Sequence, residues 1–132
     1  MNFALDTNIV SRLWKQDPIV EAHFKAVDPA LIAIPAGVLA ELHCGKFLNP
    51  TRAPKLEILI ADLIAAYPVL PFEAGAAEWF GRLKCRLRGN AIDDRDLLIA
   101  STALAHGHVM VTNNTKHFHR IDELVLRDWT VA

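Results

Sequence analysis

The chain has 132 residues, of which 52% are hydrophobic, and a formal net charge of −1. This length suits a single domain with a sizeable core, and this hydrophobic content excludes a disordered chain. The near-neutral charge argues against a nucleic-acid partner, because phosphate binders usually carry an excess of Lys and Arg. That argument weakens if some acids bind a cation, since neutralising Asp6, Glu41, Asp93 and Asp96 would leave the rest of the chain net positive.

The cysteines and the apolar segments bear on the compartment. Cys44 and Cys85 lie far apart and outside any Cys-x-x-Cys pattern, so they indicate neither a disulfide framework nor a zinc knuckle. Asp6 interrupts the apolar start of the chain, and no apolar run approaches 18 residues, so we expect neither a signal peptide nor a membrane span. The sequence thus predicts a cytoplasmic protein with reduced cysteines.

The first half of the chain alternates short apolar segments with helical patterns. Residues 3–5 predict a buried strand that ends at Asp6, and the apolar positions after Thr7 predict a helix. The elements expected next are a helix over 20–27, a strand over 31–34, a helix that begins at Pro35, and a helix over 55–66. Asp6 therefore lies where a strand ends and a helix begins, the edge at which parallel α/β sheets build their sites, although an N-cap role is equally open.

The second half continues the alternation. The expected elements are a strand over 69–72, near a sheet edge because of Pro71, a helix over 73–88, a strongly apolar helix that begins at residues 93–94, and strands over 108–111 and 124–126. Strands that alternate with helices predict an α/β fold. We expect one domain over residues 1–132, with three layers and a mostly parallel central sheet of about five strands flanked by helices.

Three carboxylates, Asp93, Asp94 and Asp96, stand at the start of the most apolar helical segment. Helical spacing places Asp96 beside Ile99 and Ala100, and no Lys or Arg lies three or four residues away. One interpretation is capping, with Asp93 as N-cap and Asp96 three residues on, as in a capping box. The other is that Asp96 binds a cation together with carboxylates from elsewhere in the chain.

Glu41 is a second acid without a local partner. In the helix after Pro35 it lies at the edge of the apolar stripe, and the residues three and four positions away are Gly37, Val38, Cys44 and Gly45. An ion pair along the helix is therefore excluded, whereas an ordinary solvated glutamate stays open.

In a parallel sheet, Asp6, Glu41 and Asp96 could converge at one edge. Three neighbouring carboxylates repel one another, so such a site needs a divalent cation or raised pKa values. Oxygen ligands suit Mg²⁺ or Mn²⁺ rather than Zn²⁺. The His-x-His pairs at 106/108 and 117/119 are a weaker zinc alternative, because no Cys or carboxylate spacing completes that site.

Four motifs carry a resemblance to a known family. They are LDTNI at residues 5–9, AEL at 40–42 with Gly45, DLLIA at 96–100 with Ala103, and VTNN at 111–114 with His117 and Phe118. In this order, over essentially the whole chain, they resemble the PIN-domain ribonucleases of the VapC toxin family. The resemblance implies a Mg²⁺-dependent endoribonuclease, the toxin of a type II toxin–antitoxin system. It also implies a homodimer that is neutralised by a VapB-type antitoxin.

The resemblance also assigns roles at the site. It places Asp6, Glu41 and Asp96 at the family's invariant acids, as metal ligands and catalytic residues. The fourth acidic position is here Asn113 or Asn114, and we take Asn114 as the remaining catalytic candidate. Mechanistically, Asp6 and Asp96 are expected to hold the metal most directly, while Glu41 orients or deprotonates the attacking water.

Further residues are candidates for supporting roles. Those for support of the metal site are Thr112, Asp93 and Asp94, of which either aspartate could replace the missing acid. Those for RNA backbone contacts are Lys46, Arg82, Lys84, Arg86 and Arg88, although a solvated surface is the plainer explanation of this cluster. Apolar walls for an antitoxin segment are offered by Trp14, Phe47 and residues 56–63.

Two other functions stay open at this point. The acids could merely cap helices of a non-catalytic PIN-like binding module. A small phosphatase of the haloacid dehalogenase kind is less favoured, because it needs a second Asp two residues after Asp6, where this chain has Asn8.

Overall fold

A five-stranded parallel sheet lies at the centre of the structure, a computed structural model that describes residues 1–132. The strands are β1 (Phe3–Leu5), β2 (Ile32–Pro35), β3 (Val69–Leu70), β4 (Val109–Val111) and β5 (Leu126–Arg127). Their spatial order is β3-β2-β1-β4-β5, and every neighbouring pair is parallel. The prediction of a parallel sheet of about five strands is confirmed, and β3 is an edge strand as Pro71 suggested. Because β1 is central, Asp6 lies in the middle of the carboxyl edge.

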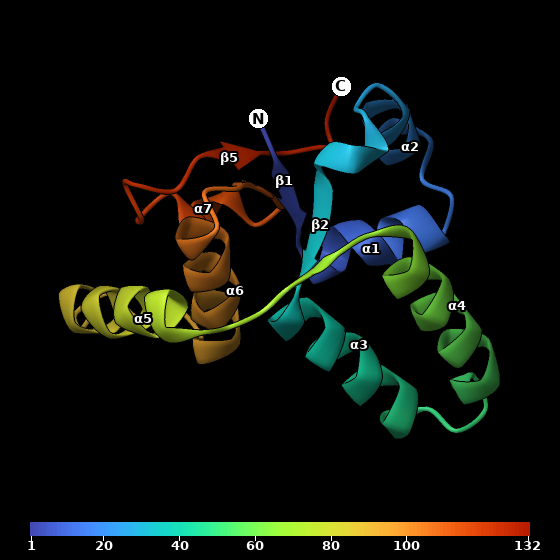
Figure 1. Cartoon of the computed structure of the whole chain (residues 1–132), viewed down its shortest axis with the longest axis horizontal. Coiled ribbons are helices and arrows are strands. Elements are labelled where there is room, and N and C mark those ends of the chain that lie inside the picture. Colours follow the sequence, from blue (N-terminus) through green and yellow to red (C-terminus); the bar gives the residue numbers. More distant parts are fainter.

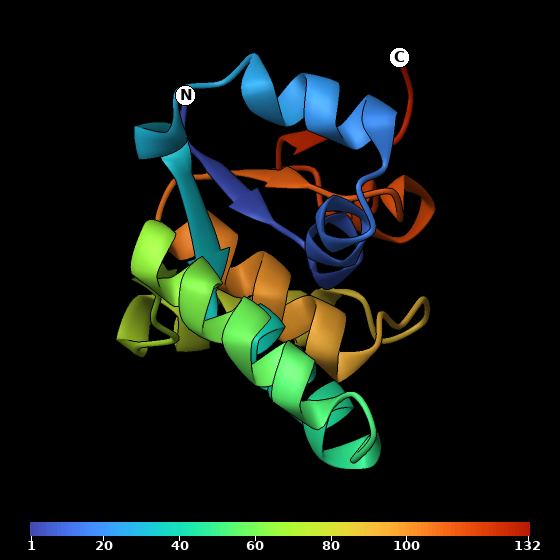
Figure 2. The ribbon, with the colours of Figure 1, turned by 90° about the vertical axis from the view of Figure 1, so that its right-hand side faces the viewer.

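Helices cover both faces of this sheet (Figure 1). They are α1 (Thr7–Trp14), α2 (Pro18–Lys25), α3 (Ala36–Leu48), α4 (Ala53–Ala66), α5 (Ala74–Arg86), α6 (Asp94–Ala105) and α7 (Thr115–Phe118), with a short 3₁₀ helix at Pro29–Leu31. Figure 2 shows α2 on one side of β1 and β2, and α4 and α6 on the other side. The three-layer α/β architecture is therefore confirmed. None of the helices combines the length and apolar character that crossing a bilayer requires.

The core explains why the strands are uniformly apolar. Every residue of β1, β2 and β4 is buried, as expected for parallel strands that are covered on both faces. Helix α6 is buried on most sides, and its fully buried residues include Ile99, Ala100 and Ala103. Helix α6 packs against β2 and β4 as well as against α3 and α5, so its first turn is held firmly near the carboxyl edge of the sheet.

Several element boundaries differ from the expectations. Helix α2 begins at Pro18 rather than at residue 20, because Asp17 Oδ1 accepts the backbone N–H groups of Ile19 and Val20 at 3.0 and 3.3 Å. Pro35 does not open α3 but ends β2, where it pairs with Leu70. The expected helix over 73–88 ends at Arg86, the last strand lies at 126–127 rather than 124–126, and helix α7 was not anticipated.

Candidate active site

The three predicted acids line one cavity of about 450 Å³ at the carboxyl edge of the sheet. Its walls contain no hydrophobic residue and consist of Asp6, Thr7, Asn8, Ser11, Glu41, Asp96, Asn113 and Asn114. These residues come from the ends of β1 and β4 and from helices α1, α3 and α6. The tertiary fold thus joins segments that are up to about a hundred positions apart in sequence.

Asp6 is held at both carboxylate oxygens. Oδ1 accepts the backbone N–H of Thr7 at 2.8 Å, so Asp6 is the N-cap of α1, as one interpretation of the sequence proposed. Oδ2 accepts the hydroxyl of Thr112 at 2.8 Å. Asp6 is only 7% exposed, and burial raises its pKa while the two hydrogen bonds lower it. The capping bond involves only Oδ1, and Asp6 lines the cavity as well as capping α1.

Glu41 reaches the cavity from the middle of α3. Its Oε1 accepts a hydrogen bond from Thr7 Oγ1 at 3.1 Å, which connects α3 to the start of α1. Burial raises the pKa of Glu41, and the negative charges of Asp6 and Asp96 raise it further, while Thr7 and Arg95 lower it. Sequence reasoning missed Thr7, although it directly follows Asp6 in the LDTNI motif. Glu41 is thus not a freely solvated glutamate.

Asp96 projects from the first turn of α6 into the same cavity. Burial is the largest cause of its raised pKa, followed by the charges of Asp6 and Asp93. His117 and Arg95 oppose this shift. The capping oxygen of α6 belongs to Asp93, which accepts the N–H of Arg95 at 2.9 Å. Asp93 is therefore the cap, as predicted, and Asp96 is available for another role.

The carboxylates fit a hard divalent cation. Burial raises the pKa of all three, and acidic neighbours raise the pKa values of Glu41 and Asp96 further, a repulsion that a cation would reverse. Their donor atoms are all oxygen, the type that Mg²⁺ prefers. As the side chains stand, no group of three or more His, Cys, Asp or Glu residues is arranged to hold a metal ion. Mg²⁺ usually keeps several waters and takes one or two carboxylates from the protein, so it does not require that all three acids bind it directly.

The segment after β4 supports the acids. Thr112 is fully buried, and its hydroxyl oxygen accepts the backbone N–H of Asn114 at 3.0 Å while its hydrogen goes to Asp6. The Asn114 side-chain nitrogen lies 3.0 Å from His117 Nδ1. Asn113 and Asn114 both line the cavity, at the position where the resemblance predicts a fourth acid. The structure therefore brings Thr112 and Asn114 to the site.

Asp93 and Asp94 do not reach the cavity. Asp93 caps α6 and pairs with Arg95 Nε at 3.2 Å, and these bonds to Arg95 lower its pKa. Asp94 accepts the ammonium group of Lys84 at 3.1 Å. Both carboxylates are exposed and already paired, so neither lies where it would replace the fourth acid.

The basic residues proposed for RNA are largely neutralised. The ion pairs are Arg82 with Glu78 at 2.9 Å, Lys84 with Asp94 at 3.1 Å, and Arg86 with Glu123 at 2.8 Å. Arg88 is exposed and forms no such pair. Lys46 is only 7% exposed and lies 3.6 Å from Glu57, so the structure does not present it to the cavity. These roles stay predictions, and the structure favours Arg88 among them.

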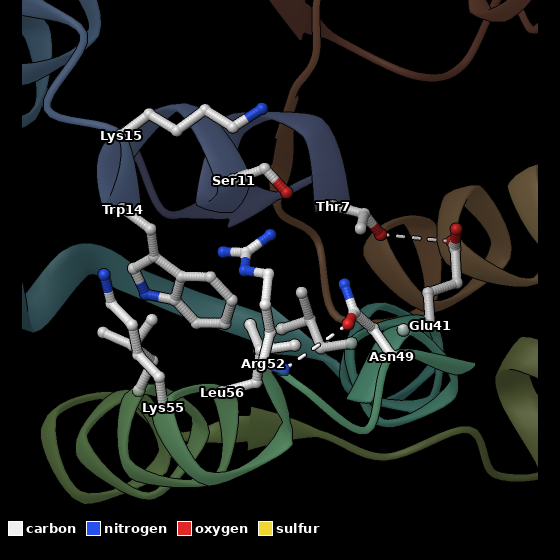
Figure 3. A pocket seen from close by; sticks show the side chains of 12 residues that line it. Thr7, Ser11, Trp14, Lys15, Glu41, Asn49, Arg52, Lys55 and Leu56 are labelled. Atoms are coloured by element: carbon white, nitrogen blue, oxygen red, sulfur yellow. Dashed lines mark hydrogen bonds between the residues drawn. The ribbon is translucent and has the colours of Figure 1, made fainter. Parts of the chain in front are cut away.

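A second cavity beside the acids was not foreseen. It measures about 490 Å³ and lies between α1, the end of α3 and the start of α4 (Figure 3). Its lining includes Trp14, Lys15, Arg52 and Lys55. Arg52 is the N-cap residue of α4 and Lys55 lies in its first turn, and neither carries a spacing signal, so only the fold could place them near Glu41.

Comparison with known proteins places this geometry in a family. A family model described as PIN domain matches residues 3–124. The chain is similar to ribonuclease VapC2 of Rickettsia felis, with 33% identity over 98% of each chain. It is also similar to the tRNA(fMet)-specific endonuclease VapC of Shigella flexneri, with 28% identity over 98% of this chain and 99% of the relative.

A solved structure of a VapBC complex is similar to this chain in fold as well as in sequence. The crystal structure of VapBC2 from Rickettsia felis, bound to a DNA fragment from the promoter, contains a chain that matches at a TM-score of 0.87. The identity is 31%, and the match covers 98% of this chain and 99% of the other. The motifs that suggested the resemblance supply the acids of the cavity. The chain therefore belongs to the PIN-domain family, and within it to the VapC group.

Proposed function

We propose that this protein is a Mg²⁺-dependent endoribonuclease that acts as the toxin of a VapBC-type toxin–antitoxin system. The carrying observation is that Asp6, Glu41 and Asp96 line one wholly polar cavity and have raised pKa values. Relatives named as a ribonuclease and as a tRNA(fMet)-specific endonuclease support RNA as the substrate.

Asp6, Glu41 and Asp96 would hold the Mg²⁺, and Mn²⁺ is expected to substitute for it. When bound, the cation supplies a water of lowered pKa and stabilises negative charge on the phosphoryl oxygens. Asp6 is the most constrained of the three, because hydrogen bonds fix both of its oxygens. The hydrogen bond from Thr112 therefore supports Asp6 as a ligand.

Glu41 is the candidate for orienting or deprotonating the attacking water. The hydroxyl of Thr7 fixes one of its oxygens, which holds the carboxylate in position beside the cavity. Asn114, which also lines the cavity, completes the catalytic set. In-line attack on an RNA phosphodiester would leave a 5′-phosphate and a 3′-hydroxyl. Products that end in a 2′,3′-cyclic phosphate would contradict this route.

The partners of the proposed toxin are a VapB-type antitoxin and a second copy of the chain. The Rickettsia felis neighbour is a VapBC complex, which supports an antitoxin partner. Of the apolar walls expected for it, Leu56, Ile60 and Leu63 are buried, whereas Phe47 is 74% exposed and its neighbour Leu48 is 79% exposed. We therefore assign the antitoxin contact to the exposed end of α3, in a cytoplasmic complex.

The decisive experiment is cleavage of defined RNAs, tRNAs among them, by the partner-free protein. Reactions with Mg²⁺, with Mn²⁺ and with EDTA are run beside the Asp96→Asn variant. Metal-dependent cleavage that is lost in Asp96→Asn is the expected result. A folded wild-type protein that is as inactive as the variant on every RNA would contradict the proposal.

One observation bears on the alternative of a non-catalytic binding module. Asp6 caps α1, as that alternative requires, but Glu41 lies in the middle of α3 and Asp96 makes no capping bond to α6. Two of the three acids thus have no capping function. A thermal unfolding midpoint that does not change with Mg²⁺ would favour the binding module instead.

A further inference from the structure

The cavity beside the acids has the opposite charge. It shares Thr7, Ser11 and Glu41 with the acidic cavity, so the two cavities meet along one side of α1. The remaining lining of the second cavity includes three basic residues and no further acid. The metal-free acidic cavity would repel a polyanion, whereas the basic residues of the second cavity would attract it.

The three basic residues are available for a ligand. Lys15, Arg52 and Lys55 are exposed, and none of them forms an ion pair with a carboxylate within 4.0 Å. This distinguishes them from Lys84 and Arg86, whose charges are neutralised. Helix α4 also begins here, without an acidic residue in its first turn and without a side-chain cap, so its positive end adds to the field.

Trp14 gives this cavity an aromatic wall. Figure 3 shows its indole extending from α1 towards α4, between the side chains of Arg52 and Lys55 in this view. Leu56 and Leu59 of α4 add apolar side chains to the lining. An aromatic ring next to unpaired basic side chains is the combination with which proteins bind single-stranded nucleic acid, the base stacked on the ring and the phosphate beside the cations.

We propose that this cavity is a nucleotide subsite, which binds the base of one RNA nucleotide on Trp14 and its phosphate against Arg52 and Lys55. The proposal rests on the proposed ribonuclease function, because Glu41 lines both this cavity and the cavity of the acids. The volume of about 490 Å³ lies within the range of ligand sites. An acidic peptide would use the basic side chains but not the ring, so the composition favours RNA. The subsite would give the enzyme selectivity at one position of the strand.

The test is RNA affinity in an Asp96→Asn background, which separates binding from cleavage. A fluorescent single-stranded RNA is titrated at several salt concentrations. Trp14→Leu should weaken binding by about 5- to 150-fold, the loss expected for one stacked base, whereas Trp14→Phe should largely restore it. Arg52→Gln and Lys55→Gln should each reduce the dependence of log affinity on log salt by about 0.7.

The controls address folding and charge. Lys25→Gln removes an exposed cation on α2, outside both cavities, and should leave affinity and salt dependence unchanged. Because Trp14 packs against the core, each variant is checked by thermal unfolding. The Phe variant retains an aromatic ring, so a rescue by Phe but not by Leu identifies stacking rather than packing.

The binding and cleavage results distinguish failure of the nucleotide subsite from failure of the proposed ribonuclease function. If wild-type protein cleaves RNA, and folded Trp14→Leu and Arg52→Gln proteins bind RNA as tightly as their Asp96→Asn parent, the subsite is overturned while the ribonuclease stands. The cavity would then be a docking surface for a protein segment. If wild-type protein neither cleaves nor binds any RNA, the proposed function fails and the subsite fails with it.

Discussion

Thr112, directly after β4, donates its hydroxyl hydrogen to Asp6, directly after β1, with 2.8 Å between Oγ1 and Oδ2. The two strands are neighbours in the sheet, with Leu5 paired to Val111, so the residues that follow them lie side by side. Thr112 is fully buried and Asp6 nearly so. This bond therefore sets the direction in which the Asp6 carboxylate faces the cavity.

Thr112→Val tests that relationship with little change in shape. We expect Mg²⁺ affinity to fall about 10- to 100-fold, as for other residues that support a metal ligand, and the free energy of unfolding to fall by about 1 kcal/mol. Isothermal titration and urea unfolding measure the two effects. Thr102→Val is the matched control, because it removes a buried hydroxyl that bonds only to Leu98 O on α6. Equal Mg²⁺ affinities in both variants would contradict the role of Thr112.

Metal binding should stabilise the protein through the acids. A ligand that binds only the folded state adds about 2.7 kcal/mol at 100 times its dissociation constant. We expect saturating Mg²⁺ to raise the melting temperature of wild-type protein by several degrees and that of Asp96→Asn far less. Differential scanning fluorimetry measures both. Asp62→Asn is the control, because Asp62 is an exposed acid of α4 outside the cavity.

Stability without metal should depend on pH in a defined direction. The pKa values of Asp6, Glu41 and Asp96 are raised by folding, so the folded state holds these protons more tightly than the unfolded chain. Below the ordinary pKa values of 3.8 for Asp and 4.5 for Glu, the three acids are protonated in both states and do not destabilise the fold. As pH rises through their pKa values in the folded protein, the acids become charged and lower the free energy of unfolding. In EDTA, we expect Asp96→Asn to be more stable than wild type at pH 7 and to lose this advantage by pH 3. An advantage that is constant with pH would show that burial of the charged Asp96 carboxylate beside other acids is not its cause.

The basic residues of α5 and the turn after it should contribute unequally to RNA binding. Arg86 forms two 2.8 Å hydrogen bonds to Glu123, which hold the pKa of that carboxyl at about 2, whereas Arg88 forms no ion pair. We expect Arg88→Gln to reduce the salt dependence of RNA affinity and Arg86→Gln to change it less. Fluorescence anisotropy at several salt concentrations compares them. Binding that is insensitive to salt and to both substitutions would remove this surface from the RNA path.

Two glycines of α3 should respond in opposite directions to alanine. A Cβ at Gly37 would lie 3.1 Å from Cγ1 of the fully buried Ile99 on α6, whereas a Cβ at Gly45 would meet nothing within 4 Å. We expect Gly37→Ala to destabilise the fold by about 1–3 kcal/mol through overpacking. Gly45→Ala should stabilise it by about 0.5–1 kcal/mol, because alanine loses less backbone entropy in a helix. Urea unfolding measures the change in the free energy of unfolding for each variant. A Gly37→Ala protein as stable as wild type would show that α6 can shift to accept the methyl group.

The sequence by itself determined the sheet and the three acids. Uniformly apolar runs of three or four residues indicate strands that are buried on both faces. A polar residue directly after such a run indicates the carboxyl edge of a parallel sheet. Asp6 was found in this way, and Asp93 was identified as a cap from its position before α6. Glu41 and Asp96 were found because helical spacing gave them no local partner. Each of these patterns involves residues that are close together in the sequence, so the sequence alone reveals them.

Only the tertiary structure decided which polar groups meet. The bond from Thr7 to Glu41 and the bond from Thr112 to Asp6 join residues 34 and 106 positions apart, and no periodicity encodes such distances. Exposed basic side chains are also indistinguishable in sequence, whether they are paired, as Arg86 is, or available, as Arg52 is. The physical reason is that apolar patterning reports burial along one element, whereas ion pairs and cavities depend on how separate elements pack in space.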